Sequence, residues 1–538
     1  MLARLILVAL PLVAVYLFTK FRYKRFKQFS HIPQLKSSFI WGHLKVLHEY
    51  ISRGPPGCHI DDVLGVMADD LGNPAVVLVD LRPVSSPMAI ITSHYVAEQI
   101  SRPTKQQPWS TPKSPTLGVY HKLIGPQSIL LKEGEDWKRM RKRFNPGFAR
   151  QHLMTLLPVI MDKTATFLKH LDSYAATGED LELMELTINL TFDIIGAVVM
   201  DVDFDAQHHD GQGSFIRLYS ELMNSYPGES GRTPWWLQPM STWNRRQVAN
   251  RVDNVLKQMI RQKFAESRQQ EAGKKSRSVL NLALQGTETL TDELLDETCD
   301  QVKTFLFAGH DTTSILLTWI VYEMSRTPRI AKAIRAELDD IFGPDTDPTA
   351  VRDKLLSPQG DDMLRRMSYT SAVVKEALRL HPPAGSARMT DPGTHLTVTT
   401  PQGEEICLDG MVIYLCHTII QKDRAVYGDS PNDFVPERWL GDTDTSENGT
   451  NVDMPDSTHE KDSGRSKIPV SAWRPFERGP RSCIGQELAN IEARVILAMI
   501  GRRYDFVKVG LGELYHDEKG QPVLNEKGKY KVKSEIYS

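Results

Sequence analysis

One stretch, Trp473 to Glu492, constrains this chain more than any other; it reads W-R-P-F-E-R-G-P-R-S-C-I-G-Q-E-L-A-N-I-E. It places Cys483 in a loop rich in glycine and proline, directly before a helical pattern. Gly479 and Pro480 favour a tight turn. The helix that follows directs its positive end toward the sulfur, which favours the thiolate over the thiol. A thiolate held in this way is either a metal ligand or a nucleophile.

The residues around Cys483 distinguish between these two roles. A nucleophilic cysteine needs a nearby histidine base, and a zinc site needs further ligands at C-x-x-C spacing, but the loop supplies neither. A single thiolate suits the fifth ligand of a haem iron. The pattern F-x-x-G-x-R-x-C-x-G resembles the haem-binding signature of the cytochrome P450 family. The resemblance implies that Phe476 covers the sulfur, Arg481 contacts a propionate of haem b, and Gly485 lets the helix approach the macrocycle.

Residues 291–326 are predicted to form one long helix, because an N-cap threonine begins an apolar pattern that a proline ends. The polar motif A-G-H-D-T-T, residues 308–313, lies in its middle. One interpretation is two helices joined at Gly309, since glycine and buried polar groups are unfavourable inside a helix. The motif matches the A-G-x-D-T-T of the same family. That resemblance implies one helix with a widened groove over haem, in which Asp311 and Thr312 deliver protons.

Two further segments are implied to hold the haem propionates. In W-K-R-M-R, Trp137 and Arg141 are four residues apart and share a helix face. The resemblance implies that both contact a propionate, with charge-assisted hydrogen bonds from the guanidinium. Arg388 is implied as a second propionate ligand, although its spacing from Arg379 is one residue shorter than in many relatives.

A buried ionic network is implied near the cysteine loop. Glu376 and Arg379 form an E-x-x-R pair at i, i+3, a pattern that is usually exposed and weak. The motif F-V-P-E-R-W further along the chain contains Arg438. In the family, an arginine at this position completes a Glu-Arg-Arg network, so the resemblance implies that these three residues stabilise the fold around the cysteine loop.

The helix that contains Trp137 also has a basic face. A solvated surface is the usual role of such a run. Beside a haem, it is also suited to docking an acidic electron donor, and the resemblance implies NADPH–cytochrome P450 reductase, with cytochrome b5 as a further partner. The basic residues are Lys138, Arg139, Lys142 and Arg143.

The first 19 residues are predicted to form a membrane anchor. Leu2 to Phe18 is mostly apolar and lies at the short end of the length that spans a bilayer. The basic residues of 20–27 follow it, and by the positive-inside rule they stay in the cytosol. A cleaved signal peptide would have its basic residues before the apolar run; a helix buried in the fold is the other alternative. We expect a single-pass anchor in the endoplasmic reticulum, with the catalytic domain in the cytosol.

The rest of the chain is interpreted as a basic, proline-containing linker, 20–45, and one haem-thiolate domain, 46–538. The resemblance implies a mainly α fold with small β-sheets, and the hydrophobic content of 41% is enough for a large core. A net charge of −2 gives no support to a nucleic-acid partner. Five scattered cysteines argue against a disulfide framework. Residues 441–467 have hardly any apolar side chains and are predicted to be a disordered insertion.

These features predict an NADPH- and O2-dependent monooxygenase that hydroxylates or epoxidises an apolar small molecule at a membrane. The sequence has no flavin or nicotinamide fingerprint, so electrons are expected from another protein. H-P-P-A-G-S-A-R, residues 381–388, resembles fungal members, which indicates secondary metabolism. The alternatives are a haem-thiolate isomerase or dehydratase and a non-catalytic haem sensor. Asp311 and Thr312 favour the monooxygenase, because neither alternative needs them.

Overall fold

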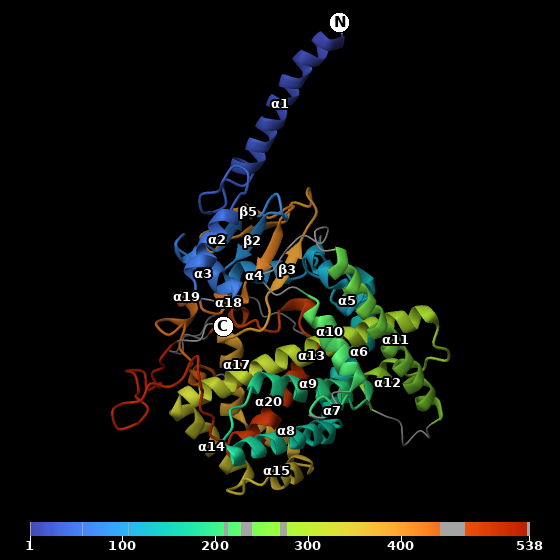
Figure 1. Ribbon diagram of the computed structural model, residues 1–538, viewed down its shortest axis with the longest axis vertical. Helices are drawn as coiled ribbons and strands as arrows, with labels where there is room; N and C mark the ends of the chain where they lie inside the picture. The colour runs from blue at the N-terminus through green and yellow to red at the C-terminus, as the bar shows by residue number, and fades with distance from the viewer. Residues whose placement is uncertain are drawn as a thin grey trace.

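The structure is a computed structural model that describes residues 2–55, 57–105, 107–208, 213–226, 239–269, 277–441 and 468–534, with side chains from residue 10 onward except that of residue 214. Within these ranges the chain forms a large helical lobe and a smaller lobe built on a β-sheet (Figure 1). The first helix projects away from the smaller lobe. The predicted insertion, 441–467, lies outside the described residues except for Gly441.

The smaller lobe contains a four-stranded mixed sheet in the order β1-β2-β6-β3. Its first two strands are antiparallel, β2 and β6 run parallel, and β6 is antiparallel to β3. A separate pair, β4-β5, is antiparallel. The strands are β1 Val76–Val79, β2 Met88–Ile91, β3 Ser386–Met389, β4 Thr397–Thr399, β5 Glu405–Cys407 and β6 Val412–Leu415.

Helices make up most of the remainder, in agreement with the predicted fold class. Those near the sheet are α1 Leu2–Phe26, α2 Leu44–Arg53, α3 Ile60–Asp69, α4 His94–Ser101, α18 His417–Ile420 and α19 Arg424–Tyr427. Those from the first half of the helical lobe are α5 His121–Ile124, α6 Gly134–Phe144, α7 Arg150–Met154, α8 Leu157–Thr177, α9 Leu183–Met200, α10 Ser214–Asn224, α11 Pro239–Gln269 and α12 Val279–Ala283. The later ones are α13 Asp292–Arg326, α14 Pro328–Phe342, α15 Pro348–Leu355, α16 Gly360–Arg366, α17 Ser368–Leu380 and α20 Gln486–Ile500.

The long helix α13 crosses the centre of the helical lobe (Figure 1). The Thr291 side chain caps its first turn by accepting a hydrogen bond from the backbone N–H of Leu294 at 3.3 Å. The helix continues without interruption through Gly309, so the alternative of two joined helices is wrong. A Cβ on Gly309 would lie 2.6 Å from the side chain of Ile195. Glycine is therefore needed here because α9 packs closely against α13.

The helix α9 lies in the core next to α13. Among the helices whose side chains are described over a full membrane span, α9 is the one that is long and apolar enough to cross a bilayer, yet 67% of it is buried inside the protein. It therefore packs as a central core helix. A second core lies beneath the sheet, where Ile32, Val76 and Ile413 are each buried.

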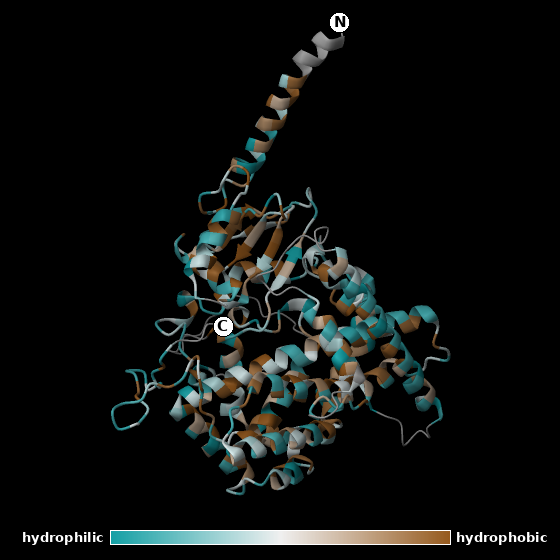
Figure 2. Cartoon of the chain, in the orientation of Figure 1, coloured by the Kyte–Doolittle hydropathy of each residue, from teal (hydrophilic) through white to brown (hydrophobic). Residues whose placement is uncertain are grey.

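The helix α1 has a very different environment from α9. Its apolar side chains from Leu10 to Phe18 are exposed, and in Figure 2 brown residues line the projecting helix. The side chains of residues 1–9 lie outside the described part of the chain. A helix with exposed apolar side chains on all sides needs an apolar environment, and so α1 is a candidate membrane anchor.

Candidate functional site

The loop before α20 holds Cys483 by backbone contacts. The N–H of Cys483 donates to the carbonyl oxygen of Phe476 at 2.8 Å, and that of Ser482 donates to Gly479 at 3.1 Å. Gly479 has a φ of +73°, and a Cβ there would lie 2.2 Å from the carbonyl oxygen of Ser101. No residue with a side chain fits this position, so the turn depends on glycine.

The sulfur of Cys483 faces open space at the start of α20. The Cys483 side chain is exposed although the loop around it is packed into the protein. A Cβ on Gly485 would lie 3.9 Å from the sulfur. Glycine at this position therefore keeps the space beside the sulfur free.

Two opposing effects act on the Cys483 thiol. Desolvation raises its pKa above the ordinary value, while hydrogen bonds from the backbone N–H groups of Gly485 and Gln486 and the charge of Arg141 lower it. The predicted effect of the helix end is present, but desolvation is larger. Protein atoms surround the accessible sulfur, so its thiolate is poorly solvated, and a bound cation would supply the charge that this thiolate needs.

Several cations lie on one side of this loop. The Arg141 guanidinium donates from Nη1 to the carbonyl oxygen of Ser482 at 2.6 Å. The guanidinium of Arg481 lies 4.9 Å from the ring of the buried Trp137 and forms an ion pair with Glu133 at 2.5 Å. The structure thus brings all three predicted propionate contacts of α6 and the cysteine loop together.

Arg388 joins this group from β3. It is fully buried, and Nη1 donates to the carbonyl oxygen of Thr111 at 3.0 Å. Its Nε and Nη2 have no hydrogen-bond partner among the described residues, and the nearest carboxylate, that of Glu477, is 3.9 Å away. A buried guanidinium with unused N–H groups is costly unless an anion binds there.

Lys113 is a further cation in this group that the sequence analysis missed. Its Nζ donates to the Ser386 hydroxyl at 2.9 Å. Desolvation, followed by the charge of the neighbouring Arg388, lowers the pKa of Lys113 to about 7. Close cations with few carboxylates beside the sulfur fit a planar group that has a metal at its centre and acidic groups at its edge.

The polar motif of α13 opens into the interior of the fold. Ala308 is exposed although most residues around it on the helix are buried, and the Thr312 hydroxyl is exposed one turn later. This hydroxyl donates to the carbonyl oxygen of Ala308 at 2.7 Å. Asp311 is half-buried and forms no ion pair with another described residue. An acid and an alcohol are thus adjacent on an open stretch of an otherwise packed helix.

A second acid lies close to this motif and was also missed. Glu492 of α20 is 2% exposed, and its carboxyl group accepts a hydrogen bond from the hydroxyl of Thr313. Desolvation raises the pKa of Glu492 to about 8. The carboxyl group of Glu492 therefore keeps its proton at neutral pH. It lies inside the protein beside Thr313, the residue that follows Thr312.

The predicted ionic network is buried. The Arg379 guanidinium forms two hydrogen bonds with the Glu376 carboxylate, at 2.8 and 2.9 Å, and Arg438 forms one at 3.1 Å. The same carboxylate accepts from the indole N–H of Trp439 at 2.9 Å. Arg379 also donates to the carbonyl oxygen of Gln421. The network connects α17 with the segment that leads to the cysteine loop, and every polar atom of the carboxylate is used.

The basic face of α6 is partly neutralised. Arg139 and Arg143 both form ion pairs with Glu297 of α13, at 3.1 and 3.0 Å. Lys138 lies over the ring of Trp109 at 4.7 Å. Lys142 is exposed. Part of the predicted docking face therefore connects two helices instead.

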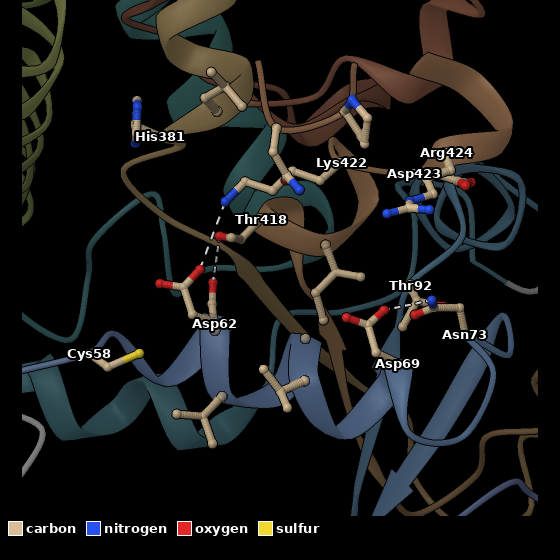
Figure 3. Close-up of a pocket in the computed structure, with 18 of the residues that line it drawn as sticks. Cys58, Asp62, Asp69, Asn73, Thr92, His381, Thr418, Lys422, Asp423 and Arg424 are labelled. Carbon is tan, nitrogen blue, oxygen red and sulfur yellow. Dashed lines mark hydrogen bonds and ion pairs between the residues drawn. The ribbon is translucent and has the colours of Figure 1, made fainter. Parts of the chain in front are cut away.

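A groove of the described residues lies elsewhere, between α3, the last turns of α13 and α18–α19 (Figure 3). It has a volume of about 1290 Å³, and neither Cys483 nor Thr312 lines it. Its charges are largely balanced within the groove: Lys422 lies 3.8 Å from Asp62, as Figure 3 shows, and Lys529 lies 2.7 Å from Glu323. This groove therefore has no excess charge that would favour an ionic ligand.

A single thiol at the start of a helix, with several cations nearby, is the arrangement expected of a protein that binds an iron–thiolate group. Residues 77–534 match the family model described as Cytochrome P450. This chain belongs to the cytochrome P450 family of monooxygenases, whose cofactor is a haem with a thiolate ligand.

Several fungal proteins are similar to this chain. "Cytochrome P450 monooxygenase acrF" of Aspergillus aculeatus is 33% identical over 450 residues, which cover 80% of this chain and 83% of that protein. "Cytochrome P450 monooxygenase polC" of Polytolypa hystricis is 27% identical over 538 residues, covering 92% and 87%. "Cytochrome P450 monooxygenase FUM15" of Gibberella moniliformis is 26% identical, covering 70% and 67%.

Proposed function

We propose that this chain is a haem b monooxygenase that inserts one atom of O2 into an apolar organic substrate, by hydroxylation or epoxidation, in fungal secondary metabolism. The observation that carries this proposal is the adjacent acid and alcohol, Asp311 and Thr312, on the open stretch of α13. A haem-thiolate isomerase or dehydratase would not need them. The fungal relatives support the setting, since each is named as a cytochrome P450 monooxygenase.

The residues around Cys483 would hold the cofactor. Haem, when bound, supplies the activation of O2 and the transfer of an oxygen atom to the substrate. Cys483 would supply the thiolate ligand, with Phe476 beside the sulfur and Gly485 leaving room for the cofactor. The unused N–H groups of Arg388 support its role toward a propionate. The other propionate contacts would come from Trp137, Arg141, Arg481 and Lys113.

Asp311 and Thr312 would move protons. Among the described residues, the Thr312 hydroxyl has one hydrogen-bond partner, the carbonyl oxygen of Ala308. It can therefore rotate to donate into the space beside Ala308 and regain a proton through water from the neighbouring carboxyl group. The structural network of Glu376, Arg379 and Arg438 would keep the cysteine loop in place during this work.

Electrons would come from NADPH–cytochrome P450 reductase, with cytochrome b5 as a second donor. Lys138 and Lys142 of α6 are exposed cations close to the cysteine loop. Such a surface attracts acidic donors at low ionic strength. We further propose that residues 1–19 anchor the chain in the endoplasmic reticulum membrane, residues 20–45 link the anchor to the domain, and the domain faces the cytosol.

The cofactor assignment is tested with the carbon monoxide difference spectrum of the reduced protein. The wild type should show the Soret band of a thiolate-ligated haem, and Cys483→Ser should lose it. An unchanged band in the variant would refute the assignment of Cys483.

The reaction is tested with compounds that accumulate in a deletion strain of the source organism. A substrate should be converted in the presence of reductase, with consumption of NADPH and O2 in proportion to product. Conversion without NADPH would instead indicate an isomerase or dehydratase.

A further inference from the structure

The end of the candidate anchor helix is fixed to the catalytic domain by a buried cation. Between Leu10 and Gln28, Arg25 is the one buried residue, and the basic residues on either side of it, Lys24 and Lys27, are exposed. The Arg25 side chain is 2% exposed and forms an ion pair with the equally buried Asp80 at 2.5 Å. The Arg25 side chain is therefore shielded from water and points into the β-sheet lobe.

Every nitrogen of the Arg25 guanidinium is used in this contact. Nε donates to the carbonyl oxygen of Phe39 at 2.9 Å, and Nη2 donates to those of Ile40 and Arg82 at 2.8 and 3.0 Å. Nη1 donates to Asp80. A buried charge with a full set of partners holds its neighbours in one geometry, whereas loss of one partner leaves the other uncompensated.

A second arginine reinforces the contact from the domain. Arg82 forms hydrogen bonds with both oxygens of Asp80, at 2.8 and 2.9 Å, and donates to the carbonyl oxygen of Lys24 in α1 at 2.6 Å. Desolvation would raise the pKa of Asp80, but the hydrogen bonds of Arg82 and the charges of both arginines hold it below its ordinary value. Asp80 is thus charged at neutral pH.

The loop that contains Phe39 and Gly42 covers the Arg25 side chain and leaves room for it. Gly42 has a φ of +53°, and a Cβ there would lie 2.3 Å from Nη1 of Arg25 and 2.4 Å from the carbonyl oxygen of Asp80. The ring of Phe39, in the same loop, contacts Phe18, Phe21 and Phe26 of α1, with ring centroids 5.5, 4.9 and 6.0 Å apart. The segment predicted as a linker is therefore packed against both the helix and the sheet.

We propose that Arg25, Asp80 and Arg82 form a clamp that joins α1 rigidly to the catalytic domain and holds the surface at the base of the helix in the lipid headgroup layer. This inference rests on the proposed membrane anchor. The surface consists of exposed apolar side chains beside the clamp: Ile40 is 57% exposed, Trp41 47% and Val84 68%.

The chemistry of this surface fits the interface of a bilayer with anionic lipids. Aromatic residues such as Trp41 favour the depth of the headgroups. Exposed cations in the last turns of α1 and directly after it add attraction to anionic headgroups; they are Lys20, Arg22, Lys24 and Lys27. An anchor and a second contact together bind a membrane more strongly than either does alone. Because the clamp fixes α1 to the domain, insertion of the helix also brings the apolar surface into contact with the bilayer.

The clamp is tested by limited trypsin digestion of the full-length holoprotein in detergent. Cleavage after residues 24–27 should be at least roughly tenfold faster in Asp80→Asn than in the wild type, because loss of the charged partner releases Arg25. Arg22→Gln is the matched control, since Arg22 is exposed one turn away and should leave this cleavage rate unchanged. The carbon monoxide spectrum of each variant checks that the domain is intact. Equal cleavage rates in Asp80→Asn and the wild type would overturn the clamp.

The lipid contact is tested in vesicles of phosphatidylcholine and phosphatidylserine that contain lipids brominated high on the acyl chain. Tryptophan fluorescence should be quenched in the wild type, and the quenching should fall in Trp41→Phe and in Asp80→Asn. Equal quenching in the wild type and Trp41→Phe would overturn the lipid contact. Failure of the wild type to float with vesicles would instead refute the membrane anchor itself, while the digestion in detergent would still decide the clamp.

Discussion

Single residues set the charge of the interior around the site. Arg388 and Lys113 bring positive charge into it, and desolvation, followed by the charge of Arg388, lowers the pKa of Lys113 to about 7. In Glu492 of α20, burial raises the pKa of the carboxyl group to about 8, so that the group stays protonated at neutral pH. The interior around the site therefore combines an excess of cations, which fits a bound anion, with one neutral carboxyl group.

Thr312→Ala should uncouple oxygen consumption from product formation. The variant keeps helix propensity and removes one hydroxyl, so haem content should be retained. Without the Thr312 hydroxyl, proton delivery is no longer directed, and part of the O2 is reduced to hydrogen peroxide at the expense of NADPH. The ratio of product formed to NADPH consumed should therefore fall severalfold. A second route through His310 is disfavoured because its ring packs between Phe192 and Tyr219. A fully coupled variant would contradict the role of Thr312.

Glu492→Gln should change how stability depends on pH. A carboxyl group whose pKa is raised in the folded state binds more protons there than in the unfolded chain. The wild type therefore loses stability as pH rises from about 4.5 to about 8, by at most about 1.4 kcal/mol per unit. Glutamine does not titrate, so the variant should gain stability relative to the wild type over this window. Thermal unfolding of both proteins at several pH values measures this difference in stability. If the stability of both proteins depended on pH in the same way, the raised pKa of Glu492 would be contradicted.

Whole elements show what the sequence could and could not predict. The bounds of α13 were predictable because its cap, its apolar pattern and the proline after it are all local. Lys113 was missed because it lies in an irregular loop with no periodicity, and its importance comes from a contact with β3 far along the chain. Glu492 was missed because one acid in an amphipathic helix resembles a surface residue. Gly309 was noted, but its close contact with Ile195 depends on how α9 packs.

The helix α6 carries a prediction about the electron donor. Lys142→Gln should slow reduction by the reductase and weaken its dependence on salt, since Lys142 is exposed. Arg143→Gln removes the same charge but should mainly lower thermal stability, because its ion pair with Glu297 and its hydrogen bond to Ala283 are lost. Stopped-flow reduction and thermal unfolding separate the two. If both variants slowed reduction equally, Arg143 would also belong to the surface that binds the electron donor.

At the scale of the molecule, the proposed topology places the two lobes on one side of a membrane. The apolar part of α1 projects beyond the sheet, and its basic turns lie next to the domain (Figure 1). Protease added to sealed microsomes should therefore digest the domain. Full protection of the domain without detergent would reverse this orientation.

The two ends of the segment between Leu440 and Ile468 are tied to the same turn of α17. On one side, the indole of Trp439 donates to Glu376; on the other, that of Trp473 donates to the carbonyl oxygen of Lys375 at 3.0 Å. The two indole rings also contact each other, with centroids 6.4 Å apart. The chain before and after this segment is therefore held at the same place on α17.

Because both ends of this segment are held at the same place, we expect the protein to tolerate changes in its length and sequence. Replacement of residues 442–467 by a short glycine–serine connection should leave the carbon monoxide spectrum and thermal stability almost unchanged, since loop length alone costs little. A peptide tag or a fluorescent reporter could be inserted at the same place, on a catalytic domain whose two termini need not be touched. Because the two indole hydrogen bonds fix both ends of the segment, we expect its length to have little effect on the position of Cys483.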